Sequence, residues 1–151
     1  MILAVIAFVV IILDQFTKYL IKTSMYPRES IPVIENIFHI TFIKNSGAAF
    51  GIFQGQIIFL IVMTILIIFL LVGVYWKLAR QNTILTIGLA LQLGGAIGNL
   101  ADRIRFSYVV DFFDFRVWPV FNIADIAIVI GVAIVAWQIL IWPEEQKEKT
   151  G

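Results

Sequence analysis

Three carboxylates gather in a short polar stretch, residues 108–125, of a chain in which charge is scarce: Asp111, Asp114 and Asp125. Long apolar runs flank this stretch, at residues 84–100 and 126–142. A carboxylate beside such runs is costly to keep unless it is paired or protonated. Two carboxylates held close together share a proton, so one takes a proton from water while the other donates to a carbonyl oxygen or leaving amine. We expect Asp111 and Asp125 to form this acid–base pair, with Asp114 as the competing partner.

The position of Asp125 favours one role within the pair. If Asn122 caps the helix that follows, Asp125 is its third residue and lies near the positive end of the helix dipole, which favours the ionised form. Asp125 is then the base and Asp111 the acid, although the two roles can exchange during turnover. The spacing agrees equally well with Asp125 merely completing a capping arrangement with Asn122, so both interpretations stay open.

The composition indicates a membrane protein. The 151 residues are 61% hydrophobic and only 14% charged, whereas soluble domains are about half apolar and about a quarter charged. The absence of Cys excludes a disulfide or thiolate nucleophile. The single histidine, His39, excludes a multi-histidine metal site, and we expect no metal and no cofactor. A net charge of +1 without a basic stripe gives no indication of nucleic-acid binding.

Four apolar runs approach the roughly 20 residues that a helix needs to cross a bilayer: about 1–21, 56–76, 84–101 and 122–142. We therefore predict an all-α membrane protein, a single domain over residues 1–151 with four transmembrane helices. A small β-like extramembrane insert, residues 22–55, separates the first two spans, and a site loop, residues 104–121, joins the last two. The first run continues into Asp14–Lys18 instead of a cleavage site, so it is expected to be a retained span.

Polar residues of distant segments converge on one membrane face. Four spans place both termini on one side and the insert and site loop on the other. Asp14 and Lys18 lie four residues apart, so they share a helix face and can pair; they either form only an ion pair or also support a polar site. Asn99 and Asp102 also share a face. Gly94 and Gly98 have the G-x-x-x-G spacing that lets helices pack closely in lipid.

The basic residues give an orientation of their own. The side with the termini holds Lys77, Arg80, Lys147 and Lys149. The opposite side holds Lys18, Lys22, Arg28, Lys44, Arg103, Arg105 and Arg116. Counting these residues by the positive-inside rule places the site-bearing side in the cytoplasm.

Short motifs in a fixed order strongly resemble the lipoprotein signal peptidase (signal peptidase II) family over nearly the whole chain. The matching segments are Leu13–Lys18, Asn45–Gly51, Gly98–Arg103, Val109–Phe112 and Phe121–Asp125. The resemblance implies a bacterial inner-membrane aspartyl endopeptidase. Such enzymes cleave the signal peptide of a diacylglyceryl-modified prolipoprotein just before the lipidated cysteine.

The resemblance also assigns roles to residues. It implies Asp111 and Asp125 as the catalytic pair, and it sets Asp114 aside. Supporting or substrate-binding roles fall on Asp14, Lys18, Asn45, Gly47, Asn99, Asp102, Arg103 and Asn122. It implies cytoplasmic termini and a site near the outer face, against the charge count. The expected partners are the lipidated prolipoprotein and membrane lipids, and we expect a monomer.

Two other classes of function remain as alternatives. A small four-span transporter coupled to protons or cations would also carry intramembrane carboxylates, but its acid is expected at mid-span. A non-catalytic assembly subunit is the third class. A serine–lysine arrangement of Ser46 with Lys44 or Lys18 has no support from their spacing.

Overall fold

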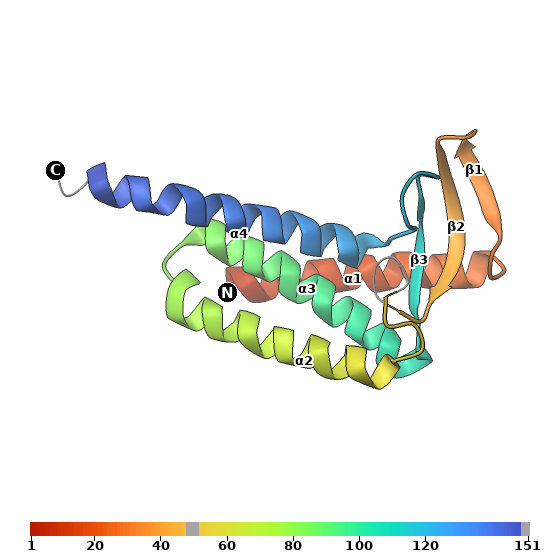
Figure 1. Ribbon diagram of the computed structural model, residues 1–151, viewed down its shortest axis with the longest axis horizontal. Helices are drawn as coiled ribbons and strands as arrows, with labels where there is room; N and C mark the ends of the chain where they lie inside the picture. The colour runs from red at the N-terminus through yellow and green to blue at the C-terminus, as the bar shows by residue number, and fades with distance from the viewer. Residues whose placement is uncertain (48–51, 149–151) are drawn as a thin grey trace.

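The computed structural model describes residues 1–47 and 52–148 and contains four long helices (Figure 1). They are α1 (Ile2–Ser24), α2 (Ile57–Val74), α3 (Thr83–Phe106) and α4 (Ile123–Glu148), and a π-helical turn, η2 (Tyr75–Ala79), extends α2. Within the described ranges, four helical segments are long and apolar enough to cross a membrane. The predicted four-span membrane fold is confirmed.

Helix α3 lies at the centre of the bundle and packs against the other three helices. In the membrane-spanning segment of α3, 56% of the residues are buried inside the molecule, compared with 11% in that of α2. Small residues allow this contact: a Cβ added to Gly94 would lie 2.7 Å from Cβ of Val10 in α1, and one added to Gly98 would lie 2.6 Å from Oδ2 of Asp14. The expected close packing at this glycine pair is confirmed.

A three-stranded antiparallel sheet covers the end of the bundle that lies away from the two termini (Figure 1). Its order is β1 (Ser30–Ile34), β2 (Phe38–Asn45) and β3 (Val109–Asp114). The insert thus supplies two strands, and the third comes from the stretch 104–121, which was expected to be a loop. That stretch also holds the end of α3, which stops where Ser107 adopts a left-handed φ of 62°. The Val- and Phe-rich sequence of β3 suits a strand paired along β2.

The alternation of side chains along β3 sets the direction of its first aspartate. Val110 and Phe112 pack with Met25 and Phe42 in a buried apolar cluster. Because successive strand residues point to opposite faces, Asp111 points away from that cluster. Of the motif Asn45–Gly51, the residues from Ala48 to Gly51, including Phe50, lie outside the described residues.

Candidate functional site

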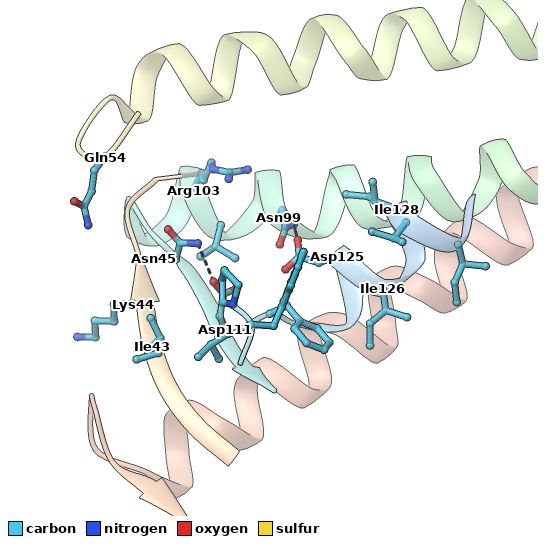
Figure 2. Close-up of a pocket in the computed structure, with 17 residues that line it drawn as sticks. Ile43, Lys44, Asn45, Gln54, Asn99, Arg103, Asp111, Asp125, Ile126 and Ile128 are labelled. Carbon is cyan, nitrogen blue, oxygen red and sulfur yellow. Dashed lines mark hydrogen bonds between the residues drawn. The ribbon is translucent and has the colours of Figure 1, made fainter. Parts of the chain in front are cut away.

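A cavity of about 920 Å³ lies where the sheet meets α3 and the start of α4, and both Asp111 and Asp125 line it (Figure 2). Asp111 comes from β3 and Asp125 from the first turn of α4. The other polar lining residues are Lys44, Asn45, Gln54, Asn99 and Arg103. The structure therefore brings together the two carboxylates that the sequence proposes as a pair.

Asparagine side chains hold both carboxylates. Asp111 is 2% exposed and accepts hydrogen bonds from Nδ2 of Asn45 at 2.9 Å and from Nδ2 of Asn122 at 2.7 Å. Asp125 accepts from Nδ2 of Asn99 at 2.8 Å (Figure 2) and from the backbone N–H of Asn122 at 3.1 Å. Asn122 therefore touches both aspartates.

The capping arrangement expected at the start of α4 is present. The backbone N–H of Asp125 donates to Oδ1 of Asn122 at 3.0 Å, while Oδ2 of Asp125 accepts from the N–H of Asn122. This reciprocal capping box uses one oxygen of Asp125, and the other oxygen is bound by Asn99. Capping and a place in the cavity are therefore compatible for one side chain.

The two carboxylates lack a close cation. In the described part of the chain, no Lys or Arg nitrogen lies within 4.0 Å of a carboxylate oxygen of Asp111 or Asp125. Burial raises the pKa of Asp111 to about 7, and the negative charge of Asp125 adds to this effect against the hydrogen bonds from Asn45 and Asn122. Near neutral pH, the Asp111 carboxyl can therefore either hold or release a proton.

A buried ion cluster lies behind this pair. Nζ of Lys18 is 2.9 Å from Oδ2 of Asp14 and 3.2 Å from Oδ2 of Asp102, and all three side chains are at most 2% exposed. Nζ also donates to Oδ1 of Asn99 at 2.9 Å, and Asn99 in turn donates to Asp125. Lys18 thus forms the expected ion pair with Asp14 and also reaches the residues that line the cavity.

The ion cluster also anchors the backbone on which the two cavity aspartates are carried. Oδ2 of Asp102 accepts from the N–H of Val110 at 3.1 Å, one residue before Asp111. Oδ1 of Asp14 accepts from the N–H of Ala124 at 3.0 Å, one residue before Asp125. Asp14 and Asp102 therefore fix the ends of the two elements that meet at the cavity.

Asp114 lies on the opposite face of β3 from Asp111 and does not line the cavity. It accepts from Oγ1 of Thr41 at 2.8 Å, from the N–H of Arg116 at 2.8 Å and from Nη1 of Arg116 at 3.1 Å. Burial raises the pKa of Asp114, but these hydrogen bonds and the charge of Arg116 outweigh burial and hold the pKa below its usual value. Asp114 is therefore an ionised group that is bound by Thr41 and Arg116 outside the cavity.

Arg103, which lines the cavity, contacts Gly47. Nη2 of Arg103 donates to the carbonyl oxygen of Gly47 at 3.3 Å, and the N–H of Gly47 donates to Oδ1 of Asn45 at 2.9 Å. A Cβ on Gly47 would lie 2.9 Å from the carbonyl oxygen of Ile52, so the turn has no room for a side chain. Nε of Arg103 is buried and has no hydrogen-bond partner among the described residues.

Sequence reasoning missed Gln15. Its Nε2 donates to Oδ1 of Asp102 at 3.0 Å and to the carbonyl oxygen of Gly98 at 3.2 Å, which joins α1 to α3 beside the ion cluster. An amide within an apolar span is a signal in itself. Among the described residues, no group of three or more His, Asp or Glu is arranged to hold a metal ion.

Comparisons with known proteins agree on one family. The family described as signal peptidase (SPase) II matches residues 6–141. The lipoprotein signal peptidase of Moorella thermoacetica is 48% identical over 140 residues, which cover 93% of each chain. That of Halothermothrix orenii is 46% identical over 147 residues, 97% of each chain.

Solved structures show the same arrangement. A bacterial membrane enzyme determined by the in meso method at 2.3 Å is similar with a TM-score of 0.87 and 39% identity, over 91% of this chain and 87% of the other. A second such structure, at 1.9 Å, has a TM-score of 0.84 and 39% identity, over 91% of this chain and 92% of the other.

Proposed function

This chain belongs to the signal peptidase II family, aspartic peptidases of bacterial membranes that cleave lipoprotein signal peptides, and we propose that Asp111 and Asp125 carry out the cleavage. The observation that carries the proposal is a cavity lined by two carboxylates that have amide partners and, among the described residues, no Lys or Arg nitrogen within 4.0 Å. The bond cut is the one just before the lipidated cysteine of a diacylglyceryl-modified prolipoprotein.

The proposed reaction uses one water molecule and no covalent intermediate. Ionised Asp125, favoured by the N-terminus of α4, accepts a proton as the water oxygen attacks the scissile carbonyl carbon. Protonated Asp111 donates to the carbonyl oxygen. Collapse of the tetrahedral intermediate breaks the C–N bond, and the proton taken from water passes to the leaving amine. A pKa of about 7 supports Asp111 as the acid, since a large share of this carboxyl is still protonated near neutral pH.

The cavity wall suits a substrate that arrives through the membrane. Ile126, Val129 and Ile130 of α4 line it, and Val129 is 67% exposed on the bundle surface. A signal helix and acyl chains can thus enter from the side. Arg103 lines the cavity beside the two aspartates, and in this proposal its guanidinium group binds a substrate carbonyl. Trp118 also lines the cavity, and movement of its loop over the scissile bond would exclude water.

The place of the pair distinguishes this function from transport. Asp111 lies in the sheet and Asp125 in the first turn of α4, whereas a coupled carrier is expected to hold its acid at mid-span. Both aspartates come from one chain, which supports the expected monomer.

The direct test is cleavage by the purified protein in lipid of two matched precursors, one with and one without the diacylglyceryl group on its cysteine. We expect a cut immediately before the cysteine in the lipidated precursor only. Equal cleavage of both precursors would contradict the substrate assignment, and a cut elsewhere would contradict the assigned bond.

We propose further that the termini are cytoplasmic and that the cavity faces the outer surface. The chain has no Cys, so a single introduced cysteine is the one thiol in it that a maleimide can label. Val117, which is 91% exposed in the loop after β3, is the position of choice, with Lys77 at the other end of the bundle as the control. In intact cells, V117C should react with an impermeant maleimide and K77C only after permeabilisation. The reverse pattern would support the charge count instead.

A further inference from the structure

On the face of the molecule that carries the sheet, some of the described lysines form no ion pair with a carboxylate. Lys18 and Arg116 pair with carboxylates, as described above. In the described part of the chain, neither Lys22 nor Lys44 has a carboxylate oxygen within 4.0 Å. Unpaired cations at a membrane face suit an anionic ligand.

Lys22 and Lys44 face a common cavity, separate from the one between the aspartates. This second cavity, about 490 Å³, is bounded by the last turn of α1 and the turn after it, by Phe42 and Lys44 of β2, and by Tyr108. Thr23, Ser24 and Tyr26 add side-chain hydroxyl groups to its lining. Two lysines and several hydroxyl-bearing residues therefore line a space large enough for a phosphate and its substituent.

The electrostatics of the second cavity favour a negative guest. Among the charges that act on Lys22, the attraction by Asp102 is the largest, and Lys44 and Arg105 both repel it. Asp102 attracts Lys22, but its Oδ2 is already bound by Lys18 and by the N–H of Val110. An anion between the two lysines would remove the repulsion.

Aromatic rings hold the two ammonium groups without neutralising them. Nζ of Lys22 lies 3.2 Å from the ring centroid of Phe106, and Nζ of Lys44 lies 5.1 Å from that of Tyr108. Cation–π contacts of this kind orient a cation and leave its charge available to a ligand. Lys22 also lies in the last turn of α1, where a cation complements the helix dipole. This interaction with the helix dipole stabilises α1, but it would not make the protein prefer one lipid over another.

We propose that the second cavity binds the phosphate of an anionic phospholipid headgroup between Lys22 and Lys44. Its place at the end of membrane-spanning α1 puts it at headgroup level, and Tyr26, 83% exposed beside it, is a residue typical of that level. Lys44 lines both cavities, so the bound headgroup lies beside the substrate cavity. The proposal concerns binding and holds independently of the catalytic assignment.

The test is native mass spectrometry of the full-length protein released from detergent micelles that contain equal amounts of phosphatidylglycerol and phosphatidylcholine. We expect a retained phosphatidylglycerol molecule, and K22Q should lower its retention relative to phosphatidylcholine by about fivefold, the share of one lysine near a charged membrane surface. K22R, which keeps the charge, should retain the lipid. K77Q makes the same charge change at the opposite end of the bundle and should have no effect.

Three results would overturn the proposal: no preference for phosphatidylglycerol in the wild type, equal losses in K22Q and K77Q, or full displacement of the lipid by low millimolar inorganic phosphate. The last result would mark a site for free phosphate. If K22Q fails to fold, K44Q provides the same comparison, because the assay measures bound lipid mass and needs no peptidase activity.

Discussion

Two groups of carboxylates are joined through Asn99, and they differ in what holds them. Asp14 and Asp102 share the ammonium group of Lys18 at 2.9 and 3.2 Å. Asp111 and Asp125 are held by the amides of three asparagines, Asn45, Asn99 and Asn122. All of these carboxylates accept hydrogen bonds, but only the first two are close to a compensating charge within the described residues.

The difference separates a structural role from a chemical one. The ammonium group of Lys18 offsets the negative charge of both carboxylates beside it. An amide satisfies the oxygen but adds no charge, so two carboxylates that share amides still repel each other and one of them retains a proton. We therefore propose that the Lys18 cluster is the support and the amide-bound pair the reactive centre.

The largest expected effect comes from removing either reactive carboxylate. D111N and D125N should each lower cleavage of a lipidated precursor by at least about 10³-fold, because neither proton transfer nor water activation survives with one carboxylate. Both variants should still fold, since asparagine is nearly isosteric and at position 125 can still cap α4. Single-turnover cleavage and thermal unfolding in the same detergent measure the two effects.

For D111N and D125N we expect a loss of activity without a loss of stability. At pH 5, where Asp111 holds its proton, we expect the free energy of unfolding to change by only about 1 kcal/mol, the scale of one hydrogen bond. Near-wild-type cleavage by either variant would show that the reactive centre has been misplaced. A collapse of the fold would assign the pair a structural role like that of Asp14 and Asp102.

The opposite pattern is expected in the Lys18 cluster. K18M leaves two buried carboxylates without their cation, which should cost about 3–5 kcal/mol of stability. Activity should fall as well, because Asn99 loses the partner that orients it toward Asp125. Chemical denaturation in mild detergent measures the loss, and K77M, at an exposed position of η2, is the control. A stable, active K18M would show that the Lys18 cluster does not support the Asp111–Asp125 pair.

The pH dependence should follow Asp111. With its pKa raised to about 7, the acid loses its proton above that pH, and cleavage should fall about tenfold for each further pH unit. The stability of the fold should also decrease as pH rises. The folded state binds the Asp111 proton more tightly than the unfolded state does. The stabilisation from this proton is therefore complete below about pH 4 and is lost as pH rises to about 7.

Both effects can be checked with one variant and one profile. Wild-type initial rates from pH 5 to 9 should show the alkaline fall. D111N, compared with wild type by unfolding at pH 5 and pH 8, should gain relative stability at the higher pH. A flat rate profile up to pH 9 would mean that Asp111 does not carry the catalytic proton.

Much of the bundle could be predicted because lipid imposes a simple rule. Every membrane-crossing segment must satisfy its own backbone, so long apolar runs become helices, and the glycine pair in α3 indicates where helices approach. Strand β3 could not be predicted in the same way. Its partner, β2, lies more than 60 residues earlier in the chain, and no local pattern identifies so distant a pairing.

The missed strand also explains why sequence reasoning left Asp114 open. Within a loop, Asp111 and Asp114 are equal candidates. Within a strand, residues three apart point to opposite faces, so recognition of β3 would have separated them without any family resemblance. Likewise, the four-residue spacing of Asp14 and Lys18 predicts their ion pair, but the contacts of Lys18 with Asp102 and Asn99 depend on how α1 and α3 pack.

Asp114 supplies the smallest expected effect and the sharpest control. It is a third kind of carboxylate, paired with Arg116, whose side chain is 49% exposed, and such pairs contribute at most about 1 kcal/mol. D114N should therefore keep cleavage within a few-fold of wild type and lose little stability, in the assays used for D111N three residues away. An inactive but folded D114N would show that a carboxylate with its own cation still takes part in the chemistry. In that case the lack of a nearby cation would no longer distinguish the reactive aspartates from the supporting ones.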